Sequence, residues 1–241
     1  MTKTNIVFQR TEKKYLLNPE QRRALEQALH GHMVQDDYGL QTIASIYYDT
    51  PDCLLIRRSL EKPLYKEKLR IRAYARPGQD SEVFVELKKK FRDVVCKRRA
   101  VMILKDAETF LQTGAAAHPL SQIQREIGWF RAFYGVVPRA FIAYEREAFF
   151  DPDGSGLRLT LDTNIRCRDR DLSFSAPFDG SSLLPEGQTL MEVKAAGAMP
   201  LWLAGMLSGL NIYPASFSKY GRYYQEVLSR ETSGGRQSHV A

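Results

Sequence analysis

Residues 158–168 read RLTLDTNIRCR, and the two faces of this segment differ almost completely in character. Successive side chains of a β-strand point to opposite faces, so alternate residues form two groups. The polar group is Arg158, Thr160, Asp162, Asn164, Arg166 and Arg168, and the other group is Leu159, Leu161, Thr163, Ile165 and Cys167. The segment therefore predicts a strand with one charged face and one mainly aliphatic face.

The same division recurs along the chain. In KEKLRIRAY, 66–74, the polar positions are Lys66, Lys68, Arg70, Arg72 and Tyr74, and they alternate with Glu67, Leu69, Ile71 and Ala73. Shorter versions contribute Arg10, Glu12 and Lys14, then Glu86, Lys88 and Lys90, then Lys97 and Arg99, and finally Glu192 and Lys194. At least five predicted strands thus carry cations at alternate positions.

Neighbouring strands lie only about 4.8 Å apart, so such crowding of like charge is costly unless anions compensate it. The carboxylates at Glu12, Glu86, Asp162 and Glu192 compensate only part of it. Two arrangements remain open: a sheet whose charged face is simply wet, and a sheet closed into a barrel whose charged faces point inward. In the barrel, the charged lumen would concentrate potential on an anion, and a linear phosphate chain would fit it.

Composition and length indicate a globular protein with an anionic partner. The chain has 241 residues and a formal net charge of +7. We expect one domain over 1–230 and a disordered tail over 231–241. Cys53, Cys96 and Cys167 show no zinc or disulfide spacing, which favours a reducing cytoplasmic location. No segment is apolar enough to span a membrane, although the protein could lie at a membrane through a partner.

The pattern of residues predicts an α+β protein built on an antiparallel sheet. Helices are predicted outside the sheet, the first of them capped by Asn18 with Pro19 at its first position. The predicted strands are 5–17, 42–49, 64–76, 82–91, 93–104, 138–151, 156–168 and 189–195. The predicted helices are 19–32, 51–60, 106–112, 119–134, 199–209 and 217–230.

Short motifs in order along the chain resemble those of the VTC-domain polyphosphate polymerases. These belong to the wider group of triphosphate tunnel metalloenzymes, which includes the CYTH phosphatases. The matching motifs are EKKY at 12–15, RIR at 70–72, VELK at 85–88, KRR at 97–99, YER at 144–146, RLTLD at 158–162, MEVK at 191–194 and SFSK at 216–219. The sequence departs from the family at Ser216, where the polymerases have an additional Lys.

The resemblance implies a closed antiparallel barrel, the triphosphate tunnel fold, and assigns roles to individual residues. Catalytic positions are implied for Arg70, Arg72, Lys88, Arg146 and Arg158. Phosphate contacts are implied for Lys14, Lys68, Lys97, Arg99, Lys194 and Lys219. A metal ligand is implied at Glu192, with Glu12, Glu86 and Asp162 as additional candidates. In KRR the family motif fits either Arg98 or Arg99, and the alternation of faces favours Arg99.

The implied function is a polyphosphate polymerase that transfers the γ-phosphate of ATP to a growing polyphosphate chain with Mn²⁺ or Mg²⁺. ATP, inorganic polyphosphate and phosphate or pyrophosphate are the expected partners, and a membrane-protein partner stays open. Alternatives are a tunnel tripolyphosphatase or nucleoside triphosphatase, and a non-catalytic polyphosphate-binding module. Nucleic acid is a poor match because few aromatic residues stand between the cations to stack on bases.

Overall fold

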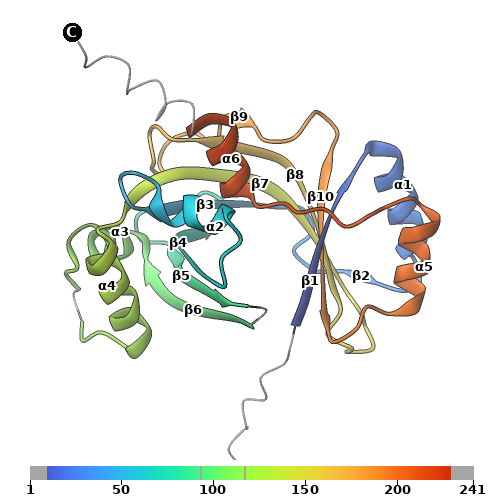
Figure 1. The fold of residues 1–241 in the computed structure, drawn as a ribbon, viewed down its shortest axis with the longest axis horizontal. Coiled ribbons are helices and arrows are strands. Elements are labelled where there is room, and N and C mark those ends of the chain that lie inside the picture. Colours follow the sequence, from blue (N-terminus) through green and yellow to red (C-terminus); the bar gives the residue numbers. More distant parts are fainter. Residues whose placement is uncertain (1–9, 93, 117, 229–241) are drawn as a thin grey trace, which may run out of the picture. The chain divides into compact units, whose positions relative to one another are not determined.

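The computed structural model describes residues 10–92, 94–116 and 118–228 and contains an antiparallel sheet with helices beside it (Figure 1). The strands are β1 (Arg10–Leu17), β2 (Val34–Gln35), β3 (Gln41–Asp49), β4 (Tyr65–Tyr74), β5 (Glu82–Phe91), β6 (Val94–Ile103), β7 (Val137–Phe150), β8 (Arg158–Arg168), β9 (Ser181–Ser182) and β10 (Thr189–Ala196). The helices are α1 (Pro19–Leu29), α2 (Leu54–Leu60), α3 (Leu104–Thr113), α4 (Gln122–Tyr134), α5 (Leu201–Gly209) and α6 (Lys219–Tyr223), followed by a π-helix over Tyr224–Leu228.

The strand order is β1-β10-β8-β7-β3-β4-β5-β6, with β2 paired to β7 and β9 to β8. The chain divides into two compact units. Of the described residues, the first unit contains 10–41, 145–164 and 184–217, and the second contains those within 42–144, 165–183 and 218–228. The strand order and the helices beside the sheet confirm the α+β class and the antiparallel sheet. Within the described residues the path ends at β1 and β6, so closure of the barrel stays a prediction.

In the second unit, the aliphatic faces of the strands pack against helices. Leu69 and Ile71 of β4 and Val85 of β5 are fully buried in a core that Phe110 of α3 and Phe130 of α4 complete. Burying an aliphatic side chain of this size contributes roughly 1.5–3 kcal/mol. The helices therefore cover the aliphatic face, and the alternating basic residues lie on the opposite face of the strands.

The first unit repeats this arrangement with its own core. Leu159 and Leu161 of β8 and Val193 of β10 pack with Leu25 of α1 and Leu203 of α5. Helix α1 begins as its sequence predicts. The Asn18 side chain accepts a hydrogen bond from the amide of Gln21, and the Gln21 side chain accepts one from the Asn18 amide. Such reciprocal caps satisfy amides that the first turn leaves unpaired.

The predicted elements are confirmed in type and order, with shorter ends in several places. Residues 5–9 of the first predicted strand and the tail 231–241 lie outside the described residues. The two-residue strands β2 and β9 were not predicted, because pairs of residues carry no periodicity. The predicted helix 217–230 changes after Tyr223 to a π-helix.

The predicted alternation is wrong at the end of β8. Arg168 does not belong to the charged face, because Asn164 adopts a positive φ of 48° and interrupts the alternation inside β8. Arg168 instead lies 3.9 Å from the ring centre of Phe141 in the core. Its guanidinium donates to the carbonyl oxygens of the segment that follows β8, at Arg170, Asp171, Ser173, Pro177 and Asp179.

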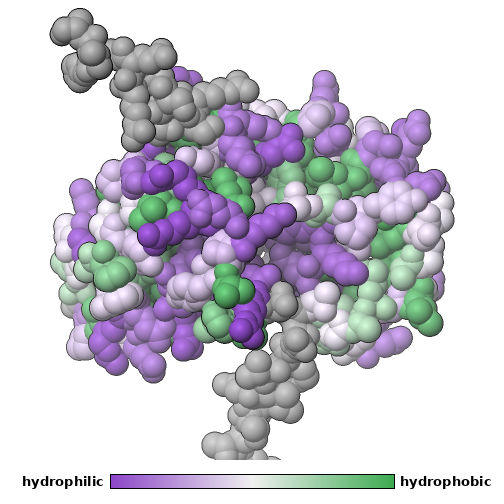
Figure 2. Space-filling view, viewed as in Figure 1, coloured by the Kyte–Doolittle hydropathy of each residue, from purple (hydrophilic) through white to green (hydrophobic). Residues whose placement is uncertain are grey.

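Hydrophilic side chains dominate the face drawn in Figure 2, and hydrophobic ones appear there in scattered patches. Among the described helices, none has the length and apolar character needed to cross a lipid bilayer.

Candidate phosphate-binding site

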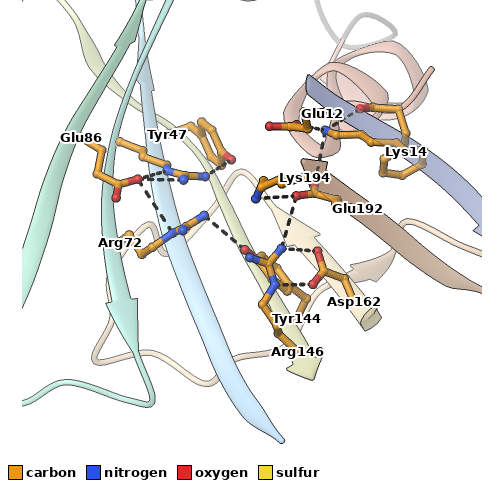
Figure 3. Close-up of polar contacts among 12 residues, drawn as sticks. Glu12, Lys14, Tyr47, Arg72, Glu86, Tyr144, Arg146, Asp162, Glu192 and Lys194 are labelled. Carbon is orange, nitrogen blue, oxygen red and sulfur yellow. Dashed lines mark hydrogen bonds and ion pairs between the residues drawn. The ribbon is translucent and has the colours of Figure 1, made fainter. Parts of the chain in front are cut away.

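The buried carboxylate of Glu86 lies beside Arg72 of β4 (Figure 3) and also contacts cations of β6. Strand pairing places it opposite Arg70 on one side and Arg99 on the other. Arg70 donates from Nε and Nη2 to Glu86 Oε2 at 2.9 and 2.8 Å. Lys97 Nζ and Arg99 Nη2 each lie 2.6 Å from Oε1, and Arg72 Nε lies 4.0 Å from Oε2. We call these five residues the Glu86 cluster.

Four cations against one carboxylate leave the Glu86 cluster with a net positive charge. Burial alone would raise the pKa of Glu86, but Arg70, Arg72 and Lys97 outweigh burial and hold it well below its usual range. Burial likewise opposes the charge on Arg70, yet Tyr47 and Glu86 raise its pKa above its ordinary value. The buried Arg72 Nε has no hydrogen-bond acceptor among the described residues. An anion such as phosphate would supply the missing charge and acceptors.

Lys97 is the member of the Glu86 cluster with the most sensitive charge. Burial lowers the pKa of Lys97 to about 8, with Glu86 opposing that shift and Arg70 and Arg99 adding to it. The side chain remains 38% exposed, so water still reaches the amine. Near neutral pH the amine is therefore mostly protonated, and it loses its charge within a range that enzymes are routinely assayed in.

This pKa predicts that tripolyphosphate binding weakens as the pH rises from 7 to 10. Loss of the Lys97 proton removes a positive charge that attracts phosphate, and tripolyphosphate is fully ionised at the upper end of this range. If binding shifts the pKa of Lys97 by one unit, the affinity falls by up to about tenfold. Lys97→Arg keeps its charge and is expected to show a shallower pH dependence. Calorimetry across this pH range measures the effect, and identical profiles for the two proteins would contradict the assignment.

Further cations of the second unit lie next to the Glu86 cluster in the strand register. Lys88 pairs with Lys68 of β4 and with Lys97 of β6, so three lysines form a row across the sheet. Lys68 Nζ also donates to Ser218 Oγ at 3.0 Å. Lys219, the first residue of α6, is 9% exposed and lies 4.3 Å from the ring centre of Tyr144.

Tyr144 and Tyr47 connect the cations of the second unit. Arg72 Nη2 donates to the Tyr144 hydroxyl at 3.3 Å, and Arg70 Nη1 donates to the Tyr47 hydroxyl at 2.9 Å. Burial would raise the pKa of Tyr47, but Arg70, Arg72 and Lys219 lower it overall. Tyr47 was not among the predicted site residues. Its signal was its place on β3, where Ser45, Tyr47 and Asp49 share one face of the strand and alternate with Ile46 and Tyr48.

In the first unit a second group of charges surrounds Glu192 of β10 (Figure 3). Lys14 Nζ lies 3.4 Å from Glu192 Oε1, and Lys194 Nζ lies 3.4 Å from Oε2. Arg146 Nη2 lies 3.7 Å from Oε2. Lys14 Nζ also lies 3.6 Å from Glu12 Oε1 and donates to the Phe217 carbonyl at 3.0 Å. We call Lys14, Arg146, Glu192 and Lys194 the Glu192 cluster.

Asp162 orients Arg146 within this cluster. The carboxylate is fully buried and accepts two hydrogen bonds from the guanidinium, from Nε at 2.5 Å and Nη2 at 2.7 Å. Arg158 pairs with Lys194 in the register but is exposed, and it makes no ion pair or hydrogen bond with its side chain in the described part of the chain. Burial lowers the pKa of Lys194, with Glu192 opposing and Arg146 adding to the shift.

The predicted metal ligands do not form a cage made by the protein alone. Within residues 10–92, 94–116 and 118–228, no group of three or more His, Cys, Asp or Glu side chains could hold a metal ion. Asp162 and Glu86 are occupied by short contacts to guanidinium groups. Glu192 lies 3.4–3.7 Å from Lys14, Arg146 and Lys194. Its carboxylate could share a metal with substrate phosphates, which is how Mg²⁺ is commonly bound.

The alternation of β6 explains the choice between neighbouring arginines. Arg99 contacts Glu86, whereas Arg98 Nε lies 3.1 Å from Glu126 of α4 on the side covered by helices. The structure thus places Arg99 on the charged face. The catalytic, phosphate-binding and metal roles given to the residues of both clusters stay predictions.

Comparison with known proteins assigns the family. A model of the VTC domain matches residues 9–228, a range that includes parts of both units. The chain belongs to the VTC domain family. No curated protein sequence matches this VTC-domain chain.

Solved structures share the fold of this VTC domain. One is a proposed adenylate cyclase from Bacillus halodurans, with a TM-score of 0.55 and 14% identity over 86% of this chain and 92% of that one. Another is a proposed adenylate cyclase from Vibrio parahaemolyticus, with a TM-score of 0.50 and 14% identity over 91% of this chain and 97% of that one. At this identity the likeness concerns the fold alone, and it confirms the expected antiparallel sheet with helices outside it.

Proposed function

We propose that this VTC domain is a polyphosphate polymerase, which transfers the γ-phosphoryl group of ATP to the end of a polyphosphate chain. The observation that carries the proposal is the Glu86 cluster, in which four cations surround one buried carboxylate. The net positive charge of this cluster can balance the negative charge of several phosphate groups. Membership of the VTC family supports the choice of reaction.

Phosphoryl transfer depends mainly on positioning and on neutralising charge. Arg70, Arg72, Arg146 and Arg158 would hold phosphate oxygens, since guanidinium groups can donate two parallel hydrogen bonds. Lys14, Lys68, Lys88, Lys97, Arg99, Lys194 and Lys219 would add positive charge along the phosphates. Mn²⁺ or Mg²⁺, held by Glu192 together with substrate oxygens, would neutralise charge on the transferred group.

The reaction forms one P–O bond and breaks another. A terminal oxygen of phosphate, pyrophosphate or polyphosphate attacks the γ-phosphorus of ATP. The bond between that phosphorus and the bridging β–γ oxygen breaks, and its electron pair leaves with ADP. Asp162 would keep Arg146 in place during this step through its two hydrogen bonds.

The test incubates the purified protein with ATP and Mn²⁺ or Mg²⁺ and measures ADP, long-chain polyphosphate and free phosphate separately. Polyphosphate formed in step with ADP is the expected result. Free phosphate without polyphosphate would indicate a hydrolase, and the absence of both products would indicate a binding module. Either of these results would overturn the polymerase proposal.

Arg70→Ala is expected to weaken tripolyphosphate binding by at least tenfold. The change removes the guanidinium that contacts Glu86 and Tyr47, and a charge-assisted hydrogen bond contributes about 1.5–3 kcal/mol. Calorimetry measures the affinity. Lys105→Ala, which removes a lysine paired with Asp80 outside both clusters, serves as the control and should bind normally. Wild-type affinity in Arg70→Ala would refute a phosphate contact at this residue.

A further inference from the structure

One buried carboxylate of the second unit has no part in the reaction described above. Asp49, the last residue of β3, is fully buried. Its Oδ1 accepts hydrogen bonds from the amides of Thr50 and Leu55, each at 2.8 Å. Its Oδ2 accepts the amide of Ile56 at 2.9 Å and the hydroxyl of Tyr220 at 3.0 Å. Asp49 thus joins the start of α2 to α6.

The hydrogen bonds to α2 replace an ordinary helix cap. Helix α2 begins after Cys53, which has a left-handed φ of 59° and makes no capping hydrogen bond with its side chain. The amides of Leu55 and Ile56 in the first turn would otherwise lack partners. Because Asp49 accepts hydrogen bonds from both amides, β3 and α2 hold its carboxylate in place independently of its contact with Tyr220.

Tyr220 contacts Asp49 and Tyr47 and directly follows Lys219. Its hydroxyl donates to Asp49, and burial followed by the charge of Asp49 raises its pKa, so the hydroxyl keeps its proton. Its ring stacks on Tyr47 with a centroid distance of 5.1 Å and an interplanar angle of 22°. Helix α6 has five residues before it continues as the π-helix Tyr224–Leu228, and helical segments this short are only marginally stable on their own. Its orientation therefore depends on contacts such as these.

We propose that Tyr220, held by Asp49, is a positioning residue that sets the place of Lys219 for phosphate binding. Lys219 is buried beside Tyr144, and the backbone of α6 links it to the anchored Tyr220. A buried ammonium group that turned away from this position would lose its contact with the Tyr144 ring. This inference rests on the proposed function only in taking Lys219 as a phosphate ligand.

The test is a double-mutant cycle with tripolyphosphate as the probe. Tyr220→Phe keeps the ring that stacks on Tyr47 and removes the hydroxyl that reaches Asp49. We expect it to weaken tripolyphosphate binding three- to tenfold, and to raise the KM for ATP with kcat little changed. In a Lys219→Met background, Tyr220→Phe is expected to cause no further loss, because the residue it positions is gone. Asp49→Asn should show the same coupling.

Tyr134→Phe is the matched control. The Tyr134 hydroxyl donates to a different buried carboxylate, Glu67, at 2.9 Å, so this variant loses an equivalent contact away from the clusters. Its thermal melt should resemble that of Tyr220→Phe, while its tripolyphosphate affinity stays at the wild-type value.

Three results would overturn the inference: wild-type affinity in Tyr220→Phe, equal losses in the presence and absence of Lys219, or no loss in Lys219→Met. Its failure is distinguishable from failure of the polymerase proposal. Coupling in the binding cycle without polyphosphate production would leave the inference standing and refute the polymerase. Polyphosphate production without coupling would do the reverse.

Discussion

Glu192→Gln is expected to lower turnover of ATP by at least about 100-fold while leaving the fold intact. The glutamine keeps the size of the side chain and removes the charge that would hold the metal with substrate phosphates. Lys14, Arg146 and Lys194 lose their shared anion. We therefore expect metal-free tripolyphosphate binding to be unchanged or tighter. Steady-state ADP release and calorimetry without metal measure the two effects.

This pairing of results separates a metal ligand from a residue that only supports the fold. Loss of structure would weaken turnover and binding together, whereas loss of a metal ligand weakens turnover alone. Glu147→Gln is the control, because Glu147 also lies in the first unit and pairs with an arginine, Arg22, at 2.5 Å. Glu192→Ala should lose turnover equally. Normal turnover in either Glu192 variant would refute the metal assignment.

Glu86→Gln is expected to destabilise the protein and to make it bind tripolyphosphate more tightly. Glu86 is 2% exposed, and removing one partner of a buried ion pair costs about 3–5 kcal/mol. For a chain of this size that corresponds to a melting temperature lowered by roughly 10 °C. Added tripolyphosphate would replace the lost anion and restore stability by binding the folded state. Thermal melts with and without tripolyphosphate measure this.

Glu67→Gln is the matched control for Glu86→Gln. Glu67 is also buried and contacts Tyr65, Lys89 and Tyr134, away from the Glu86 cluster. It should lower the melting temperature, and tripolyphosphate should raise that temperature no more than in the wild-type protein. Equal rescue of the two variants would show that the Glu86 cluster is not where tripolyphosphate binds.

The sign of the pH dependence follows from the lowered pKa of Glu86. A carboxyl group with a folded-state pKa below its unfolded value stabilises the folded state fully above the unfolded pKa, near 4.3. That contribution declines as the pH falls toward the folded-state pKa. Because glutamine does not titrate, Glu86→Gln should lose less stability than the wild-type protein over this acidic range.

Alternation predicted the charged faces correctly because period-two patterns report the side of a strand on which a residue lies. It distinguished Arg99 from Arg98 for this reason. It failed at Arg168, because Asn164 has a positive φ and the side chains after it turn to the other face of β8. The residue types in this segment give no sign of that turn. Alternation could not find the contact of Asp49 with Tyr220, since 171 residues separate them and neither residue is basic. Contacts of this kind depend on the pairing of distant elements.

The setting of Arg168 has a consequence for the evolution of the segment that follows β8. Its guanidinium is held by backbone carbonyl groups of residues 170–179, together with one side-chain contact to Asp179. Every amino acid supplies the same backbone carbonyl, so these hydrogen bonds depend on the backbone conformation of the segment and hardly on its side chains. Related proteins could therefore diversify this segment while keeping its conformation, provided that the arginine is retained.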